Sequence, residues 1–279
     1  MMIGGGASPP AHTHYLFVDA ASLLGYLEKF SARYFGGEAF AIDFAKLVPG
    51  FSKVFYYDAL PVRDTNEDED TYEKRIAPKK LTLESARNTD FVHVYEGDAR
   101  RRRRRGGLEQ KKIDVAITVD MLSYAFRGRM THATLLTGDG DFKPLVDALV
   151  HESVEVTLWY PPNETSRDLM NAADIRRPLC PRTLRELLDQ DSRDRFEVPM
   201  PINLDPAIRP SSDCVGVWVQ NGLGHALYRG GDGFYTLTRN HSALNTLHTG
   251  HSNFDLLLEY ARDSLGIVVP AEVSERAKR

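Results

Sequence analysis

Between positions 15 and 160, short runs of β-branched and aromatic residues alternate with longer amphipathic stretches. This alternation constrains the fold most, because strands that alternate with helices are typical of a mostly parallel sheet covered by helices. Strands are expected at 15–18, 53–58, 91–95, 134–136 and 155–160. Helices are expected at 23–35, 42–47, 72–87, 113–126 and 142–150, with Pro78 interrupting the third. The pattern predicts a three-layer α/β/α domain.

The remainder of the chain has a different pattern. Two short helices are expected at 164–173 and 181–188, and a segment rich in Pro, Asp, Arg and Ser follows. Three alternating runs at 215–219, 226–229 and 234–238 predict a β-meander. Ser252 stands at an N-cap position before the apolar-periodic stretch 254–265, and Gly266 stands where that helix should end. The expected organisation is a disordered tail at 1–14, a domain at 15–190, a linker at 191–213 and a small α+β unit at 214–279.

Composition narrows the classes of function. The net charge of −4 argues against a protein that coats nucleic acid, although a local basic patch can still bind it. Two cysteines, Cys180 and Cys214, are too few for a disulfide framework and indicate a reducing compartment. No apolar run is long enough for a membrane-spanning helix, and the first residues lack the features of a secretory signal. We expect a cytoplasmic protein with no membrane partner.

Carboxylates recur where strands end or helices begin. Asp19 ends the first expected strand, and the carboxyl ends of strands form the ligand crevice of open α/β sheets; an N-cap is the alternative. Asp114 opens a helix, where it can equally complement the helix dipole. Asp139 and Asp141 follow an apolar strand. Two like charges this close together cost free energy unless a cation is near, which favours a cation site. A capped turn is the alternative interpretation. Hard oxygen ligands of this kind suit Mg²⁺ or Mn²⁺.

Two charged runs interrupt the first domain, an acidic one at 64–70 and an arginine block at 100–105. Six neighbouring guanidinium groups repel one another unless an anion is close. The block is therefore a candidate for phosphate contact, with pairing to the acidic run or simple solvation as alternatives.

Histidines offer weaker signals. His93 and His132 lie in or beside expected strands, which favours a structural role. A zinc site is conceivable but lacks the close ligand pairs that anchor such sites; its members would be His241, His248, His251 and Cys214.

Three short elements resemble, in order, those of the NYN family, a branch of the PIN-like nucleases that includes bacterial LabA-like proteins. The family carries Asp-Gly-x-Asn after the first strand, Lys-Gly-Val-Asp at the start of a central helix and Ser-Gly-Asp-x-Asp-Phe after the fourth strand. This chain has Asp-Ala-Ala-Ser at 19–22, Lys-Lys-Ile-Asp at 111–114 and Thr-Gly-Asp-Gly-Asp-Phe at 137–142. Ala-Ala-Asp at 172–174 resembles the family's closing helix, so the resemblance covers about 15–174.

The resemblance implies a PIN-like domain that hydrolyses RNA phosphodiester bonds. Its catalytic residues would also hold one or two Mg²⁺ or Mn²⁺ ions, and they would be Asp19, Asp114, Asp139 and Asp141. Asp120 matches a further family acid and is a fifth candidate for the metal site. It ranks below the others, because six residues turn a helix by about 600° and Asp120 therefore faces about 120° away from Asp114. Ser22 takes the place of the family's asparagine as an auxiliary residue. The expected contacts to single-stranded or structured RNA are Arg101, Arg102, Arg103, Arg104, Arg105, Lys111 and Lys112.

Other functions stay open. Ala20, Ser22 and Lys112 depart from the family pattern and favour a weakened domain that binds RNA or a protein without cutting. A nuclease for DNA or structured RNA, acting as a toxin or defence component, is another possibility, since no motif reads a 2′-hydroxyl. A haloacid-type phosphatase is disfavoured, because its Asp-x-Asp motif should follow the first strand. A second copy of the chain is also a candidate partner, because the C-terminal unit is small.

Overall fold

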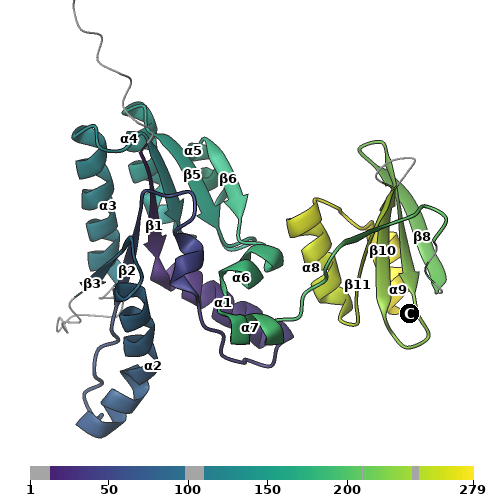
Figure 1. Cartoon of the computed structure of the whole chain (residues 1–279), viewed down its shortest axis with the longest axis horizontal. Helices are drawn as coiled ribbons and strands as arrows, with labels where there is room; N and C mark the ends of the chain where they lie inside the picture. Colours follow the sequence, from purple (N-terminus) through teal and green to yellow (C-terminus); the bar gives the residue numbers. More distant parts are fainter. Residues whose placement is uncertain (1–12, 98–109, 209, 211, 241–244) are drawn as a thin grey trace, which may run out of the picture. The chain divides into compact units, whose positions relative to one another are not determined.

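The computed structural model describes residues 13–97, 110–208, 210, 212–240 and 245–279. The chain divides into two compact units (Figure 1). One unit runs to Leu179 and includes Leu187–Asp189, and the other contains Cys180–Glu186 and Gln190–Arg279. The segment 191–213, expected to be a linker, contains most of helix α7 (Gln190–Arg195) and strand β7 (Ile202–Leu204). The finer domain boundaries stay a prediction.

The first unit is built on a parallel sheet with the strand order β3-β2-β1-β4-β5-β6 (Figure 1). Every neighbouring pair is parallel, as the alternating pattern predicts. The strands are β1 (His14–Asp19), β2 (Lys53–Ala59), β3 (Val92–Gly97), β4 (His132–Leu136), β5 (Glu155–Tyr160) and β6 (Ile175–Pro178). The expected α/β class is confirmed, although β6 was not expected. This edge strand is short and exposes two arginines, so it carries little apolar pattern.

The strand order reverses next to β1. The chain lays down β1, β2 and β3 in one direction and then returns to place β4 on the other side of β1. Val18 consequently lies opposite Tyr56 on one side and Leu136 on the other. In open α/β sheets, ligands bind outside the carboxyl ends of the strands at such a reversal. The fold therefore brings the ends of β1 and β4 together at the position where a site is expected.

Helices cover both faces of this sheet. Side chains alternate across a strand, so Phe17 packs with Ile117 and Met121 in one core while Leu16 and Val18 are fully buried on the opposite face. The helices are α1 (Ala20–Tyr34), α2 (Glu69–Arg87), α3 (Gln110–Phe126), α4 (Lys143–His151) and α5 (Arg167–Ala172). The expected helix at 42–47 is instead the short 3₁₀ helix η1 (Phe44–Leu47).

Helix α2 continues through Pro78, so the expected interruption is wrong. A proline inside a helix costs about 3 kcal/mol, because it removes one hydrogen bond and crowds the preceding turn. Ile76 and Leu83 are almost fully buried on either side of Pro78. Each such burial contributes about 1.5–3 kcal/mol, and together they offset the cost.

The second unit contains an antiparallel sheet with the order β7-β11-β10-β9-β8. Its strands after β7 are β8 (Asp213–Gln220), β9 (Leu223–Arg229), β10 (Tyr235–Asn240) and β11 (Thr246–His251). Its core joins Leu227 and Leu237 of the sheet to Leu257 and Val273 of the helices. The expected small β-sheet and helix unit is confirmed.

The helices of this unit partly differ from expectation. They are α6 (Pro181–Leu187), α7, α8 (Phe254–Leu265) and α9 (Ala271–Lys278). The N-cap of α8 is Asn253, not Ser252, because the Asn253 side chain accepts a hydrogen bond from the backbone N of Leu256 at 3.0 Å. Gly266 ends α8 in the left-handed conformation, with φ 66°. None of the helices in the described ranges is long and apolar enough to span a bilayer.

Candidate active site

Asp19 is the last residue of β1 and the N-cap of α1. Its Oδ1 accepts hydrogen bonds from the backbone N of Ala21 at 3.1 Å and of Ser22 at 3.4 Å. The side chain is almost fully buried, with 1% of Asp19 exposed. The capping role and the position at the crevice therefore coexist, because the residue that ends a parallel strand also begins the helix that follows.

Two hydroxyl groups hold the other oxygen of Asp19. Ser22 Oγ donates to Asp19 Oδ2 at 2.7 Å, and Thr137 Oγ1 donates to the same atom at 2.8 Å. Ser22 Oγ also accepts a hydrogen bond from the backbone N of Gly138 at 3.0 Å, and Thr137 Oγ1 accepts one from the backbone N of Asp139 at 3.1 Å. The end of β1 is thereby tied to the loop after β4. The motif comparison assigned no role to Thr137, which is fully buried here.

Asp139 and Asp141 lie in this loop, where the short 3₁₀ helix η2 (Gly140–Phe142) begins. Asp139 caps η2, because its Oδ1 accepts a hydrogen bond from the backbone N of Asp141 at 2.9 Å. Asp139 is partly buried, whereas Asp141 is exposed. The capped turn that was the alternative interpretation is thus present, and it orients two carboxylates at the end of β4.

Asp114 lies in the first turns of α3 and is partly buried. Its pKa is raised from 3.8 to about 6, first by burial and then by the negative charges of Asp19, Asp139 and Asp141. The interaction between two charges weakens with their separation and with solvent screening. The structure therefore brings the four expected acids into one electrostatic neighbourhood, although they come from three separate parts of the chain.

A divalent cation suits the chemistry of this neighbourhood, because four coupled carboxylates offer hard oxygen ligands and an excess of negative charge. In the part of the chain that the structure describes, however, no group of three or more His, Cys, Asp or Glu side chains is arranged to hold a metal ion. The acids are gathered without forming a coordination shell. The expected metal site stays a prediction.

Asp120 has a different partner. The hydroxyl of Tyr57 donates to Asp120 Oδ2 at 2.8 Å. Burial and this hydrogen bond to Asp120 raise the pKa of Tyr57 above its ordinary value. Asp120 therefore links α3 to β2, which agrees with its expected position on another side of the helix from Asp114.

Asp58 was missed by the sequence comparison. It lies near the end of β2, one strand away from Asp19, and only 4% of it is exposed. Its Oδ1 accepts a hydrogen bond from the backbone N of Ala59 at 2.8 Å and forms an ion pair with Lys79 Nζ at 2.7 Å. Burial and the charge of Asp19 raise the pKa of Asp58, against the opposing effect of Lys79. The available signal was an acid ending the apolar run Val-Phe-Tyr-Tyr at 54–57.

The expected nucleic-acid contacts are placed only in part. Arg101, Arg102, Arg103, Arg104 and Arg105 lie outside the described residues, as does the side chain of Lys111. Lys112 is exposed, two residues before Asp114. Their role in binding stays a prediction.

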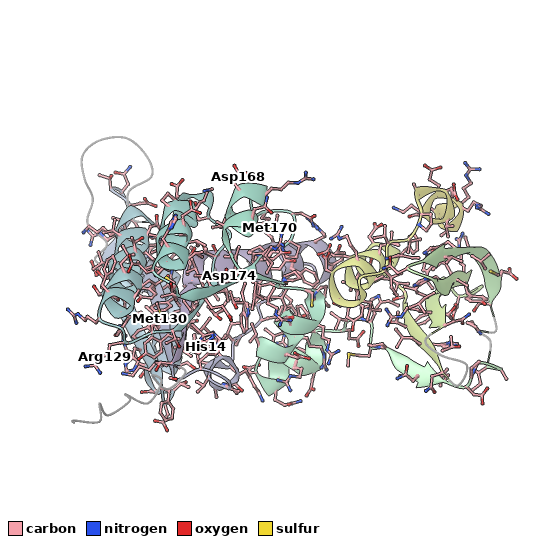
Figure 2. All side chains as sticks on the ribbon, turned by 90° about the horizontal axis from the view of Figure 1, so that it is seen from above. His14, Arg129, Met130, Asp168, Met170 and Asp174 are labelled. Atoms are coloured by element: carbon pink, nitrogen blue, oxygen red, sulfur yellow. The ribbon has the colours of Figure 1, made fainter. Side chains whose placement is uncertain are left out.

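Several candidate residues of lower rank have contacts within the fold. The ring of His93 stacks on Phe55 with 5.4 Å between the centroids. His251 Nδ1 accepts a hydrogen bond from the backbone N of Asn253 at 2.8 Å. Asp174, labelled in Figure 2, follows α5 and accepts a hydrogen bond from the backbone N of Val156 at 2.8 Å. The family-like acid at 174 thus anchors the start of β5.

Comparison with known families decides the class of the first unit. The family model of the NYN domain matches residues 15–179. The chain belongs to the NYN domain family. Its NYN domain contains all four acids, and the resemblance drawn from the short motifs is confirmed. NYN domains are nuclease-like, so the first unit is a nuclease-like domain.

The solved structures include a similar chain, a protein of unknown function from Vibrio parahaemolyticus determined by crystallography. It shares 19% sequence identity with this chain, with a TM-score of 0.45. The alignment covers 66% of this chain and 100% of the other. No match was found among curated proteins.

Proposed function

We propose that this chain is a metal-dependent endoribonuclease that hydrolyses RNA phosphodiester bonds with Asp19, Asp114, Asp139 and Asp141. The observation that supports it best is that hydrogen bonds tie Asp19 to the loop of Asp139 and Asp141, while Asp114 has a pKa raised by burial and by the charges of these three acids. Such coupling costs free energy in the metal-free protein and is relieved when a cation neutralises the carboxylates. The acid cluster lies at the reversal of the strand order, which is where open α/β sheets bind their ligands.

Mg²⁺ or Mn²⁺ held by these four acids would lower the pKa of a bound water and stabilise the charge that develops on the phosphate oxygens. The protein's own contribution is positioning. Ser22 and Thr137 fix the carboxylate of Asp19 and tie it to the loop that presents Asp139. Ser22, which replaces the family's asparagine, makes two of these contacts, and this supports activity despite the departure.

A weakened NYN domain that binds RNA or a protein without cutting is the second candidate. The observation that favours it is that both oxygens of Asp19 already accept hydrogen bonds from the protein, two for each oxygen. A carboxylate has about four acceptor positions, so a metal ion would have to displace at least one of these donors. A cytoplasmic location and a second copy of the chain as partner also stay predictions.

The test is incubation of the purified protein with labelled RNA and DNA, in Mn²⁺ and in EDTA. We expect the wild type to cleave RNA in Mn²⁺ and not in EDTA. We expect no cleavage by Asp139→Asn, which keeps the side-chain oxygen that caps η2. Asp168→Asn is the matched control, because Asp168 is an exposed acid in the first turn of α5 and lies in the same domain (Figure 2). Cleavage by Asp139→Asn at the wild-type rate would refute the assignment, and binding without cleavage would favour the second candidate.

A further inference from the structure

A pocket of about 210 Å³ lies beside Asp19 in the first unit. Its lining residues include two acids, one lysine and one apolar residue, namely Asp19, Asp58, Lys79 and Ile113. The pocket thus shares one wall, Asp19, with the candidate active site. Neither Asp58 nor Lys79 has a role in the function proposed above.

The ion pair between Asp58 and Lys79 is poorly suited to stabilise the fold. Asp58 is 96% buried, and its Oδ2 is inaccessible to solvent and has no hydrogen-bond partner among the residues that the structure describes. A buried ion pair stabilises a fold only when the geometry is good and the remaining polar atoms are satisfied; otherwise apolar residues of similar size do as well or better. Since no residue in the described part of the chain satisfies Oδ2, the contacts seen there do not explain by stability alone why a charged pair lies here.

Lys79 is the accessible member of this pair. Its side chain is 31% exposed, whereas that of Asp58 is 4% exposed. A lysine ammonium has three donors, and Asp58 Oδ1 takes one of them at 2.7 Å. Asp58 therefore holds the Nζ atom of Lys79, a residue that lines the same pocket as Asp19.

We propose that Lys79, positioned by Asp58, binds a phosphate of the RNA strand next to the acid cluster. This rests on the proposed function, because the strand must reach Asp19. The acids of the site repel phosphate oxygens, and a fixed cation at this edge of the sheet offsets part of that repulsion. A lysine ammonium is a compact point charge that suits a phosphate, and Lys79 would hold the strand in register without reading its bases.

The test measures binding of a short labelled single-stranded RNA by fluorescence anisotropy over a series of salt concentrations, in EDTA so that metal-dependent cleavage does not occur. The key variant is Lys79→Met. We expect weaker binding and a log-log salt slope that is flatter by about 0.7, the value lost with one phosphate contact on a single strand. Lys79→Arg should keep the slope. Lys80→Gln is the matched control, because Lys80 is the next residue of α2 and pairs with the exposed Glu73.

Lys79→Met leaves Asp58 buried without a cation and can weaken the fold for that reason. The double variant Asp58→Asn, Lys79→Met removes both charges and keeps the shapes. We expect this double variant to be folded and to show the same loss of salt slope. Binding by the double variant with the affinity and slope of the wild type would overturn the proposal, because Lys79 would then only neutralise Asp58.

A parallel cleavage assay in Mn²⁺ separates this inference from the proposed function. If the wild type cleaves RNA, we expect Lys79→Met to raise KM more than it lowers kcat, since the phosphate contact positions the strand. If the wild type does not cleave RNA but Lys79→Met still flattens the salt dependence of RNA binding, the nuclease proposal fails and the phosphate contact stands. If the wild type cleaves and Lys79→Met binds with an unchanged slope, the phosphate contact alone is refuted.

Discussion

Replacing Asp114 with asparagine should stabilise the metal-free protein, because the charge of Asp114 is unfavourable in the folded state. Burial and three neighbouring acids raise its pKa from 3.8 to about 6. Each pKa unit corresponds to about 1.4 kcal/mol, so this rise sets an upper limit of about 3 kcal/mol. Since Asp114 is only partly buried, solvent screening reduces the expected gain to about 1 kcal/mol.

The stabilisation expected from Asp114→Asn depends on pH. A carboxyl group whose pKa is higher in the folded state destabilises the fold most at pH values above about 6, where both states carry the charge. As the pH falls from about 6 towards 3.8, the folded state takes up the proton first and the penalty disappears. The advantage of Asp114→Asn should therefore be full at neutral pH and vanish below about pH 4.

Urea denaturation in EDTA, followed at neutral and acidic pH, measures this difference. Asp168→Asn serves as the control, and we expect it to lower stability by some tenths of a kcal/mol because it removes an acid from a helix N-terminus. Added Mn²⁺ should stabilise the wild type more than Asp114→Asn, since a ligand that binds the folded state raises its stability. An Asp114→Asn protein that is less stable than the wild type at neutral pH in EDTA would refute the electrostatic reasoning.

Three further changes test other parts of the structure. Thr137→Val removes the hydrogen bond to Asp19, so it should lower the unfolding free energy by about 2 kcal/mol and reduce cleavage. Thr137→Ser should retain both stability and cleavage. Equal melting curves for the wild type and Thr137→Val would contradict this reasoning. Gly250→Ala should destabilise the second unit by about 1–3 kcal/mol, because the new Cβ would lie 2.5 Å from a ring carbon of Phe234. An unchanged denaturation midpoint for that unit would show that Phe234 moves aside without cost. Replacing Arg101–Arg104 with serine should flatten the salt dependence of RNA binding by about 0.7 per lost contact, and an unchanged slope would assign the block to solvation or to the acidic run at 64–70.

Local patterns in the sequence were enough to predict the parallel sheet and the acids at its edge. Apolar runs and amphipathic stretches report which faces of each element are buried, and in a parallel α/β sheet the residue after a strand lies at the ligand edge whatever the distant contacts are. Asp19 and Asp139 were therefore found from their positions alone. The short motifs then predicted the NYN family, because their order and spacing along the chain require no knowledge of contacts.

The elements that the sequence missed are those whose pattern depends on a distant partner. Strand β11 has the sequence Thr-Leu-His-Thr-Gly-His and little apolar alternation, yet it is held between β10 and β7. Pro78 predicted a break that the burial of Ile76 and Leu83 prevents. In these cases tertiary packing contributes more free energy than the local preference opposes.

The partners of the site residues were also decided only by the tertiary structure. Thr137 follows Asp19 by more than a hundred residues, and only the pairing of β1 with β4 brings its hydroxyl to the carboxylate. Asp58 and Lys79 lie on β2 and α2, and no spacing rule relates them. The sequence by itself predicted the four acids of the candidate site, because residue type and position in a local motif can be read without knowledge of contacts. Contacts between distant segments decided how those residues are oriented, since hydrogen bonds and ion pairs depend on where each segment packs.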